Sequence, residues 1–181
     1  MNIKGTPLED SYIIDSTIFE DDRGYFYEKF NEAKFEELTG LNGHFVQDNV
    51  SKSSYGVLRG LHLQKGEHAQ AKLVSCLEGK VWDVAVDLRK ESPTFGKWFG
   101  VELSGENKLQ FYVPRGFGHG FSVLSETAVF AYKCDNFYNK ESEGGVLWND
   151  QELNIDWKLP AADVLLSAKD KIQPTFAEGN F

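Results

Sequence analysis

The sequence predicts an all-β fold, a sandwich or barrel of short strands, with little helix. Two observations support this prediction. Runs rich in β-branched and aromatic residues follow one another along most of the 181-residue chain. Clusters of Gly, Pro, Asn, Asp and Ser separate these runs at residues 21–24, 92–94, 104–107 and 114–116. There is no internal repeat and no Pro/Gly/Ser-rich linker, so we expect one domain that spans residues 1–181.

Ten runs have the composition and length of β-strands, and the turn clusters bound several of them directly. In chain order these expected strands are residues 11–19, 24–30, 44–51, 56–64, 72–77, 80–89, 97–104, 109–114, 119–124 and 128–134.

One stretch, Asn31–Gly40, has a helical pattern. Asn31 is a favourable N-cap residue, Glu32 suits the first turn, and Gly40 is a typical helix terminator. Phe35 and Leu38 are three residues apart, so we expect both on the buried face. A second, shorter helical turn is suggested near residues 151–153.

The composition narrows the partners and the compartment. The formal net charge of −9 argues against nonspecific binding to nucleic acid or to anionic membranes. No apolar run approaches membrane-spanning length, and the first residues have no signal-peptide pattern. Cys76 and Cys134 lie in apolar surroundings without CxxC spacing, which favours free thiols. We therefore expect a cytoplasmic protein.

The most informative stretch is residues 47–72, where polar side chains alternate with apolar ones in strand-like sequence. This pattern suggests the inner wall of a barrel that holds a ligand. Arg59 suits an anion, His62 a proton, and Lys72 a developing negative charge. Strict alternation would put Arg59 and His62 on opposite faces, so both can point inward only if the strand bulges, for which Gly60 is the natural place. The polar members of the stretch include Gln47, Asn49, Arg59, His62, Gln64, Gln70 and Lys72.

Residues 56–79 resemble the first sequence motif of the cupins, in which a Gly is followed after five residues by His-x-His, and later by Glu and Gly. Gly56 and His62 fit this motif, but Gln64 replaces the second His and Lys72 replaces the Glu. The second cupin motif is present as Pro114, Gly116 and His119, with Val123 in place of its Asn. The resemblance implies a cupin-type jelly roll, a double-sheet β-barrel with one or two short helices.

These replacements bear on the chemistry. Only two His remain, and an ammonium group would repel a divalent cation, so we expect no metal and no other cofactor. A metal dioxygenase with unusual ligands is the alternative. A cavity with His, Lys and a phenol instead suits proton transfer next to a carbonyl. His62 would be the base, Asp170 its partner, Lys72 the oxyanion stabiliser and Tyr132 the acid on the opposite side. Each of these residues taken alone also has an ordinary structural interpretation.

The chain also resembles the dTDP-4-dehydrorhamnose 3,5-epimerases from about Phe19 to Asp170. The segments that carry this resemblance are DDRGYFYEKF (21–30), QDNVSKSSYGVLRGLH (47–62), Gln70–Lys72, VWDVAVDLRKESPTFGKW (81–98), VPRGFGHGF (113–121), Tyr132, Tyr138 and LLSAKD (165–170).

This resemblance implies a homodimer that binds a dTDP-4-keto-6-deoxyhexose and epimerises C3 and C5, the carbons beside the ketone. His62 with Asp170 would accept the proton, Tyr132 would donate one, and Lys72 would steady the enolate. The matching binding residues are Arg23 and Arg59 for the diphosphate, Tyr138 with Phe19 for thymine, His119 for the sugar, and Glu28, Gln47, Asp48, Asn49, Glu143 and Lys169 for further nucleotide-sugar contacts.

Two alternatives stay open at this point. One is a relative on the same fold that epimerises one carbon only, or isomerises the keto group, with the same His, Tyr and Lys. A noncatalytic cupin that binds nucleotide sugars would need none of the three acid-base groups His62, Tyr132 and Asp170.

Overall fold

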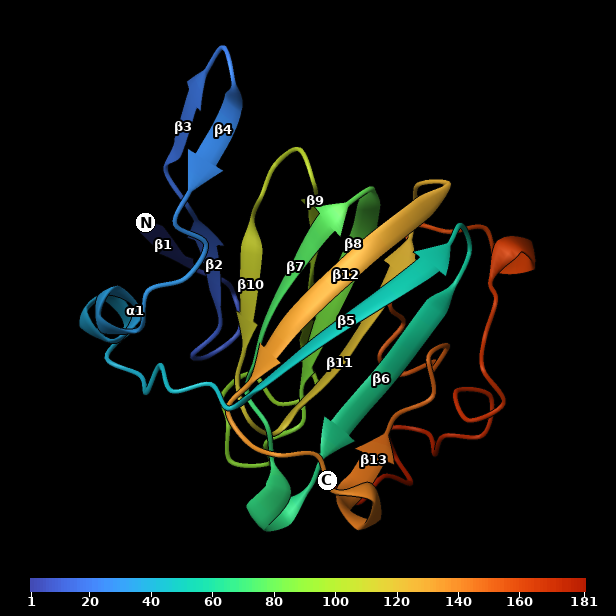
Figure 1. Ribbon diagram of the computed structural model, residues 1–181. Coiled ribbons are helices and arrows are strands. Elements are labelled where there is room, and N and C mark those ends of the chain that lie inside the picture. Colours follow the sequence, from blue (N-terminus) through green and yellow to red (C-terminus); the bar gives the residue numbers. More distant parts are fainter.

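The computed structural model describes residues 1–181 and contains two antiparallel sheets that face each other (Figure 1). The six-stranded sheet has the spatial order β1 (Asn2–Gly5), β2 (Tyr12–Asp15), β10 (Gln110–Val113), β7 (Lys72–Glu78), β12 (Thr127–Cys134) and β5 (Gln47–Ser54). The five-stranded sheet has the order β13 (Glu143–Gly145), β6 (Leu58–Gln64), β11 (Phe117–Val123), β8 (Lys80–Asp87) and β9 (Trp98–Ser104).

This arrangement confirms the all-β jelly roll expected from the sequence. The two sheets are separate hydrogen-bonded units, so the barrel is a sandwich of two open sheets. The expected strand 11–19 is interrupted after Asp15: its first half is β2 of the six-stranded sheet, and its second half forms β3 (Ile18–Asp21). With β4 (Gly24–Tyr27), β3 forms a separate hairpin that projects away from the sandwich (Figure 1).

The helix α1 (Glu32–Thr39) has the ends that the sequence predicts. The side chain of Asn31 accepts a hydrogen bond from the backbone N–H of Lys34, and Gly40 follows the helix in the left-handed conformation, with φ of 71°. Three short 3-10 turns complete the helical structure, at Gly66–His68, Lys140–Ser142 and Ala161–Asp163. The suggested helical turn at residues 151–153 is a non-helical turn.

The buried face of α1 is narrower than expected. Phe35 is fully buried and packs against an aromatic group that includes Tyr112, with ring centroids 5.2 Å apart. Leu38, by contrast, is 50% exposed, so its assignment to the buried face was wrong. The physical reason is that the helix rests on the sheet through one side chain, and Leu38 lies outside that aromatic group.

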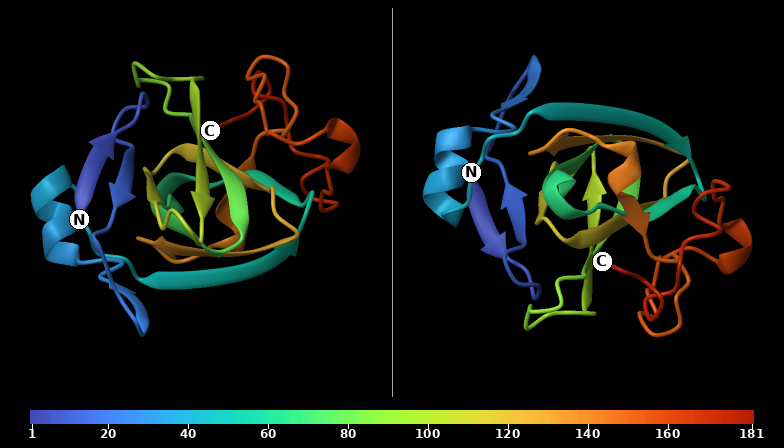
Figure 2. Two further views of the ribbon diagram at one scale, coloured as in Figure 1. Left: turned by 90° about the horizontal axis from the view of Figure 1, so that it is seen from above. Right: turned by 90° about the horizontal axis from the view of Figure 1, so that it is seen from below.

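Two apolar layers hold the five-stranded sheet in place. Its inner face packs against the six-stranded sheet through residues such as Val81, Ala85 and Phe121. Its outer face packs through Leu61 and Val84 against the C-terminal segment, residues 146–181. Figure 2 shows this segment on one side of the sandwich, with the N-terminal strands and α1 on the other. The C-terminal segment is thereby fixed against β6, which matters for the site described below.

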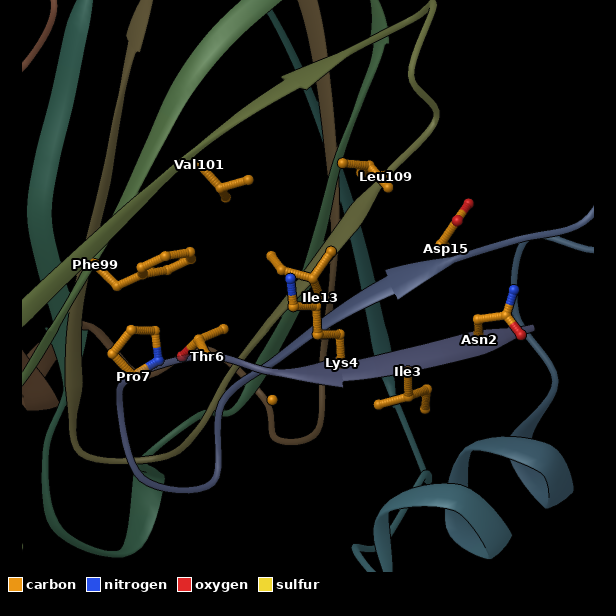
Figure 3. A pocket seen from close by; sticks show the side chains of 11 residues that line it. Asn2, Ile3, Lys4, Thr6, Pro7, Ile13, Asp15, Phe99, Val101 and Leu109 are labelled. Carbon is orange, nitrogen blue, oxygen red and sulfur yellow. The ribbon is translucent and has the colours of Figure 1, made fainter.

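A cavity of about 900 Å³ lies at the N-terminal side of the sandwich, among β1, β2 and β9 (Figure 3). Its lining is largely apolar, with Ile13, Phe99 and Val101 among the residues that surround it. Lys4 and Asp15 are its titratable residues, so it offers little acid-base chemistry. None of the helices of the chain has the length and apolar character needed to cross a bilayer.

Candidate active site

The polar cavity lies between the facing sheets. It consists of two adjoining spaces of about 130 and 270 Å³, and four residues line both of them. Asn49 and Tyr132 come from neighbouring strands of the six-stranded sheet, where they are paired across β5 and β12. Lys72 begins β7 of the same sheet, and His62 lies on β6 of the facing sheet. Both sheets therefore contribute to one site.

Gly60 brings Arg59 and His62 to the same face of β6. Paired with β11, Arg59 lies opposite Phe121 and His62 opposite His119, so β6 contains one extra residue between these pairs. Both side chains line the 270 Å³ space. Gly60 has a φ of 122°, and a Cβ atom there would lie 2.5 Å from the Cα of Gly120. The predicted bulge is thus confirmed, and glycine is required at its position.

His62 is bound to a buried carboxylate. Its Nε2 lies 2.5 Å from Oδ1 of Asp170, which the C-terminal segment supplies and which is 2% exposed. The second oxygen of Asp170 accepts a hydrogen bond of 2.6 Å from the hydroxyl of Ser167. Burial alone would raise the pKa of Asp170, but the hydrogen bonds from His62, Ser167 and the backbone of Gly60 outweigh it and lower this pKa. The carboxylate is therefore charged, and Nδ1 of His62 is left as the basic atom.

A second histidine–carboxylate pair lies beside the first. Nε2 of His119 is 3.0 Å from both carboxylate oxygens of Asp83, which is fully buried in β8. Burial raises the pKa of Asp83, and the nearby His119 and Lys72 oppose this change. Burial also lowers the pKa of Lys72, against the attraction of Cys134 and Asp83. The cavity thus contains an ammonium group that is partly removed from water and balanced by a buried acid.

Tyr132 lies across the cavity from His62, because β12 and β6 belong to facing sheets. The side chain is half-buried. Burial raises the pKa of Tyr132, Cys134 adds to this effect, and Arg59 opposes it. The phenol is therefore protonated at neutral pH and able to donate.

Tyr138 borders the smaller space on the segment that follows β12. Tyr138 is 53% exposed, and burial together with the nearby carboxylate of Glu143 raises its pKa. Glu143 in turn forms an ion pair of 2.6 Å with Lys169, which lowers the pKa of Glu143. The three residues lie together at the mouth of the site, as the family resemblance implied, and Gln47 lines the same space.

Four of the expected binding residues lie elsewhere in this chain. Phe19 and Arg23 are on the projecting hairpin, and both line a separate cavity of about 360 Å³. Arg23 forms an ion pair with Asp21 there. Glu28 follows the hairpin and is bound to Lys34. The side chain of Asp48 alternates with those of Gln47 and Asn49, so it points away from the cavity and pairs with Lys133.

The site also contains residues that the sequence analysis did not assign to it. Asp83 lies in the middle of a run that was expected to be an apolar strand. A carboxylate buried in such a strand needs a partner, and this was the feature that could have identified Asp83 as a site residue. Ser167 precedes Asp170 by three residues, a spacing that suits a side chain that binds a turn. Gln64 and Gln70 line the smaller space, although the sequence assigned neither of them a role in the site.

At the cupin ligand positions the donor set is an amide and an ammonium, Gln64 and Lys72. No group of three or more His, Cys, Asp or Glu side chains converges as metal ligands do. That the protein works without a metal stays a prediction, which metal analysis of the purified protein would check.

The fold and the cavity define a cupin-type protein with an acid-base site: a histidine–aspartate pair, a half-buried lysine and an opposed tyrosine. A family model described as dTDP-4-dehydrorhamnose 3,5-epimerase matches residues 5–178. The chain belongs to this family.

Individual relatives agree with the family model. The chain is 76% identical to a dTDP-4-dehydrorhamnose 3,5-epimerase from Elizabethkingia anophelis of known structure, with a TM-score of 0.98 over 100% of this chain and 99% of the other. It is 52% identical to the Legionella pneumophila dTDP-6-deoxy-D-glucose-3,5-epimerase in complex with dTDP-4-keto-L-rhamnose, with a TM-score of 0.93 over 97% and 93% of the two chains. It is also 52% identical to the Shigella flexneri dTDP-4-dehydrorhamnose 3,5-epimerase, over 100% of this chain and 99% of that protein.

Proposed function

We propose that the protein converts dTDP-4-dehydro-6-deoxy-D-glucose into dTDP-4-dehydro-L-rhamnose, by epimerisation at C3 and C5, as a step of dTDP-L-rhamnose biosynthesis. The observation that carries this proposal is the placement of a base and an acid on facing sheets. His62 and Tyr132 lie on opposite walls of one cavity, with Lys72 on the same wall as Tyr132. Inversion of a carbon centre needs proton removal from one face and proton return to the other.

His62 removes the proton. Because its Nε2–H is donated to Asp170, Nδ1 is free to accept the proton from the carbon next to the ketone. The charge on Asp170 stabilises the imidazolium that forms. The electron pair of the broken C–H bond passes to the ketone oxygen, which becomes an enolate.

Lys72 stabilises the enolate. Its ammonium group donates to the developing oxyanion, and partial removal from water strengthens this interaction. Asp83 attracts the ammonium group of Lys72 and so opposes the effect of burial on the pKa of Lys72. Tyr132 then donates its phenolic proton to the other face of the carbon. His62 releases the proton it accepted to solvent and Tyr132 takes up a proton, which restores both groups, and the same steps then act at the second carbon.

The nucleotide occupies the open end of the site. Arg59 suits the diphosphate, because a guanidinium group can form two parallel hydrogen bonds with phosphate oxygens. Tyr138 offers an exposed ring on which thymine can stack. The remaining polar contacts with the nucleotide sugar come from Gln47, Asn49, His119, Glu143 and Lys169.

We further propose a homodimer in which each hairpin completes the site of the other chain. The strands of the β3–β4 hairpin pair only with each other, and the side chains of Phe19 and Phe26 are 62% and 70% exposed. Phe19, Arg23 and Glu28, which the family resemblance places at the nucleotide, would then come from the second copy. β5 is an edge strand with Val50 68% exposed, and it offers the hairpin a place to pair beside the cavity.

The cytoplasm is the proposed location, since Cys76 and Cys134 are both free thiols buried in the sandwich. Nucleotide sugars as substrates agree with this location.

Incubation of the protein with dTDP-4-dehydro-6-deoxy-D-glucose in deuterated water tests the reaction. We expect deuterium at both C3 and C5 of the product. Deuterium at one carbon alone would identify a mono-epimerase, and saturable binding without any exchange would identify a noncatalytic binding protein.

A further inference from the structure

We propose that Gln64 is a positioning residue that sets the location of Tyr138, and through it the affinity for the nucleotide. This inference rests on the proposed function, in which the ring of Tyr138 stacks on the base. Gln64 occupies a position that binds metal in the cupin motif. The proposed proton transfer assigns no role to this residue.

Three glutamines hold the segment that carries Tyr138, and each binds a different backbone group. Oε1 of Gln64 accepts a hydrogen bond of 2.9 Å from the N–H of Asn139. Oε1 of Gln47 accepts one of 3.1 Å from the N–H of Tyr138 itself. The side chain of Gln70 donates one of 2.7 Å to the carbonyl of Asn136. All three glutamines line the 130 Å³ space, so the floor of the cavity and the anchor of this segment are the same side chains.

Gln64 is the most firmly placed of the three. It ends β6, two residues after His62, and is 7% exposed, whereas the ring of Tyr138 is 53% exposed. An exposed ring cannot fix its own position by burial, so its location depends on the backbone beneath it. A buried amide at the end of a central strand is a rigid point of attachment, and it lies on the strand that also carries the base.

β13 links Gln64 to the other end of Tyr138. In the pairing of β6 with β13, Gln64 lies opposite Glu143, and Figure 1 shows β13 beside the end of β6. Glu143 and Tyr138 line the same 130 Å³ space, and burial together with the carboxylate of Glu143 raises the pKa of Tyr138. The backbone that carries Tyr138 is thus bound by Gln64, and the strand paired with β6 places a carboxylate beside the ring.

The chemistry of an amide suits this task. A neutral amide offers an acceptor that does not titrate, whereas an imidazole at the same place would change its donor and acceptor pattern near neutral pH. Replacement of Gln64 therefore removes a permanent acceptor from the N–H of Asn139 and lets the segment move. Proton transfer at His62 and Tyr132 does not involve this hydrogen bond.

The test uses Gln64→Met, which keeps the length of the side chain and removes the amide oxygen. We expect the dissociation constant for dTDP, measured by calorimetry, and KM to rise about 3- to 10-fold, as the loss of one hydrogen bond to the backbone beside Tyr138 predicts. We expect kcat to change by less than about twofold, because the acid and base are untouched. The matched control is Ser122→Ala, which removes an equally buried side-chain bond to backbone, at Trp157, away from Tyr138. It should lower thermal stability and leave dTDP affinity unchanged.

A double-mutant cycle with Tyr138→Ala decides whether Gln64 acts through Tyr138. Gln64→Met should have no further effect on dTDP affinity in the Tyr138→Ala background. If the two losses are independent and add, the inference is wrong. If Tyr138→Ala alone binds dTDP like the unchanged protein, the stacking role of Tyr138 in the proposed function is wrong instead. Should Gln64→Met fail to fold, Gln64→Leu in the same cycle removes the same amide oxygen, with the same two readings.

Discussion

Ser167 and Asp170 illustrate how single residues set the chemistry of this site. The carboxylate of Asp170 uses one oxygen for His62 and the other for Ser167, so its orientation is fixed from both sides. Both hydrogen bonds favour the charged form of the carboxylate and lower its pKa despite its burial. The carboxylate that binds His62 is thus oriented by a hydroxyl that does not itself bind His62.

Ser167→Ala should therefore shift the pH dependence of the reaction. Loss of the hydroxyl raises the pKa of Asp170 from its lowered value, and a protonated Asp170 cannot stabilise the imidazolium of His62. Activity is lost as the pH falls through this pKa, so the acidic limb of the kcat/KM profile should move to higher pH. Ser167→Thr, which keeps the hydroxyl, should restore the original limb. An unchanged acidic limb in Ser167→Ala would show that Ser167 plays no part.

Tyr132→Phe should separate the two halves of the reaction. Removal of the substrate proton depends on His62 and Lys72, whereas completion of inversion depends on the phenol. Inverted product should fall about 100- to 10,000-fold, and proton removal, followed as loss of deuterium from a C5-labelled substrate, should fall much less. An equal loss of both rates would contradict the assignment of Tyr132 as the acid. Because the pKa of Tyr132 is raised, we expect no loss of the phenolic proton in the neutral range.

The sequence was sufficient for the residues with distinctive chemistry, and insufficient where partners come from distant segments. His62 and Lys72 are uncommon in apolar strands, Tyr132 brings a phenol that can donate a proton, and the structure brings all three to one cavity. Asp83 and His119 are 36 positions apart in the chain and lie on different strands, so no local sequence pattern predicts their pairing. The orientation of Asp48 follows from alternation along β5 and could have been predicted once Gln47 and Asn49 were placed inside.

At the scale of the elements, the bulge in β6 decides which side chains reach the cavity. Leu58 packs on the outer face before the bulge, and Leu61 and Leu63 pack on the same face after it. Because of the extra residue at Gly60, the leucines before and after the bulge share the outer face, while Arg59 and His62 both point inward. One glycine places Arg59 and His62, the proposed anion holder and base, in the same space.

Gly60→Ala should damage both stability and activity. The φ of 122° is unfavourable for alanine, and the added Cβ would lie 2.5 Å from the Cα of Gly120. We expect a loss of at least about 1 to 3 kcal/mol in the free energy of unfolding, measured with urea, and a large loss of solvent exchange. Gly5→Ala is the control, because a Cβ there meets nothing within 4 Å. If Gly60→Ala unfolds like the control, the geometry of the bulge is not the constraint proposed here.

The expected strands were largely correct because each has enough β-branched and aromatic residues to be recognised alone. β1 and β13 were missed for a physical reason: they contain four and three residues, and β13 is Glu-Gly-Gly. Such segments are strands because a neighbouring strand offers hydrogen bonds, which local propensity does not report. The division of residues 11–19 between two sheets has the same origin, since it depends on where each half finds a partner.

At the scale of the whole molecule, one chain holds the acid-base groups but not every residue that the family resemblance assigns to the nucleotide. Arg23 is 89% exposed on a hairpin outside the cavity of its own chain. In a homodimer that exchanges hairpins, Arg23 of one chain would lie at the cavity of the other. This would add a cation to the site of a protein with a net charge of −9. The oligomeric state and the single-domain organisation stay predictions.

Complementation between two inactive variants tests the exchange of hairpins. His62→Ala and Arg23→Ala should each be nearly inactive alone. In a mixed dimer, the Arg23→Ala chain keeps His62 and receives an intact hairpin from its partner, so one of the two sites works. Random reassembly of equal amounts after co-refolding should therefore recover about a quarter of full activity. If the mixture stays as inactive as its components while dimers form, Arg23 does not act across the interface.

The placement of His62 and Tyr132 on facing sheets also has an evolutionary consequence. Substitutions along β12 can change the fate of the enolate, while the strand that creates it, β6, stays as it is. New stereochemical outcomes can thus be selected by altering one wall at a time, with no intermediate variant that loses the first proton transfer. A protein engineer would accordingly begin on β12, and would keep β6 with its glycine unaltered.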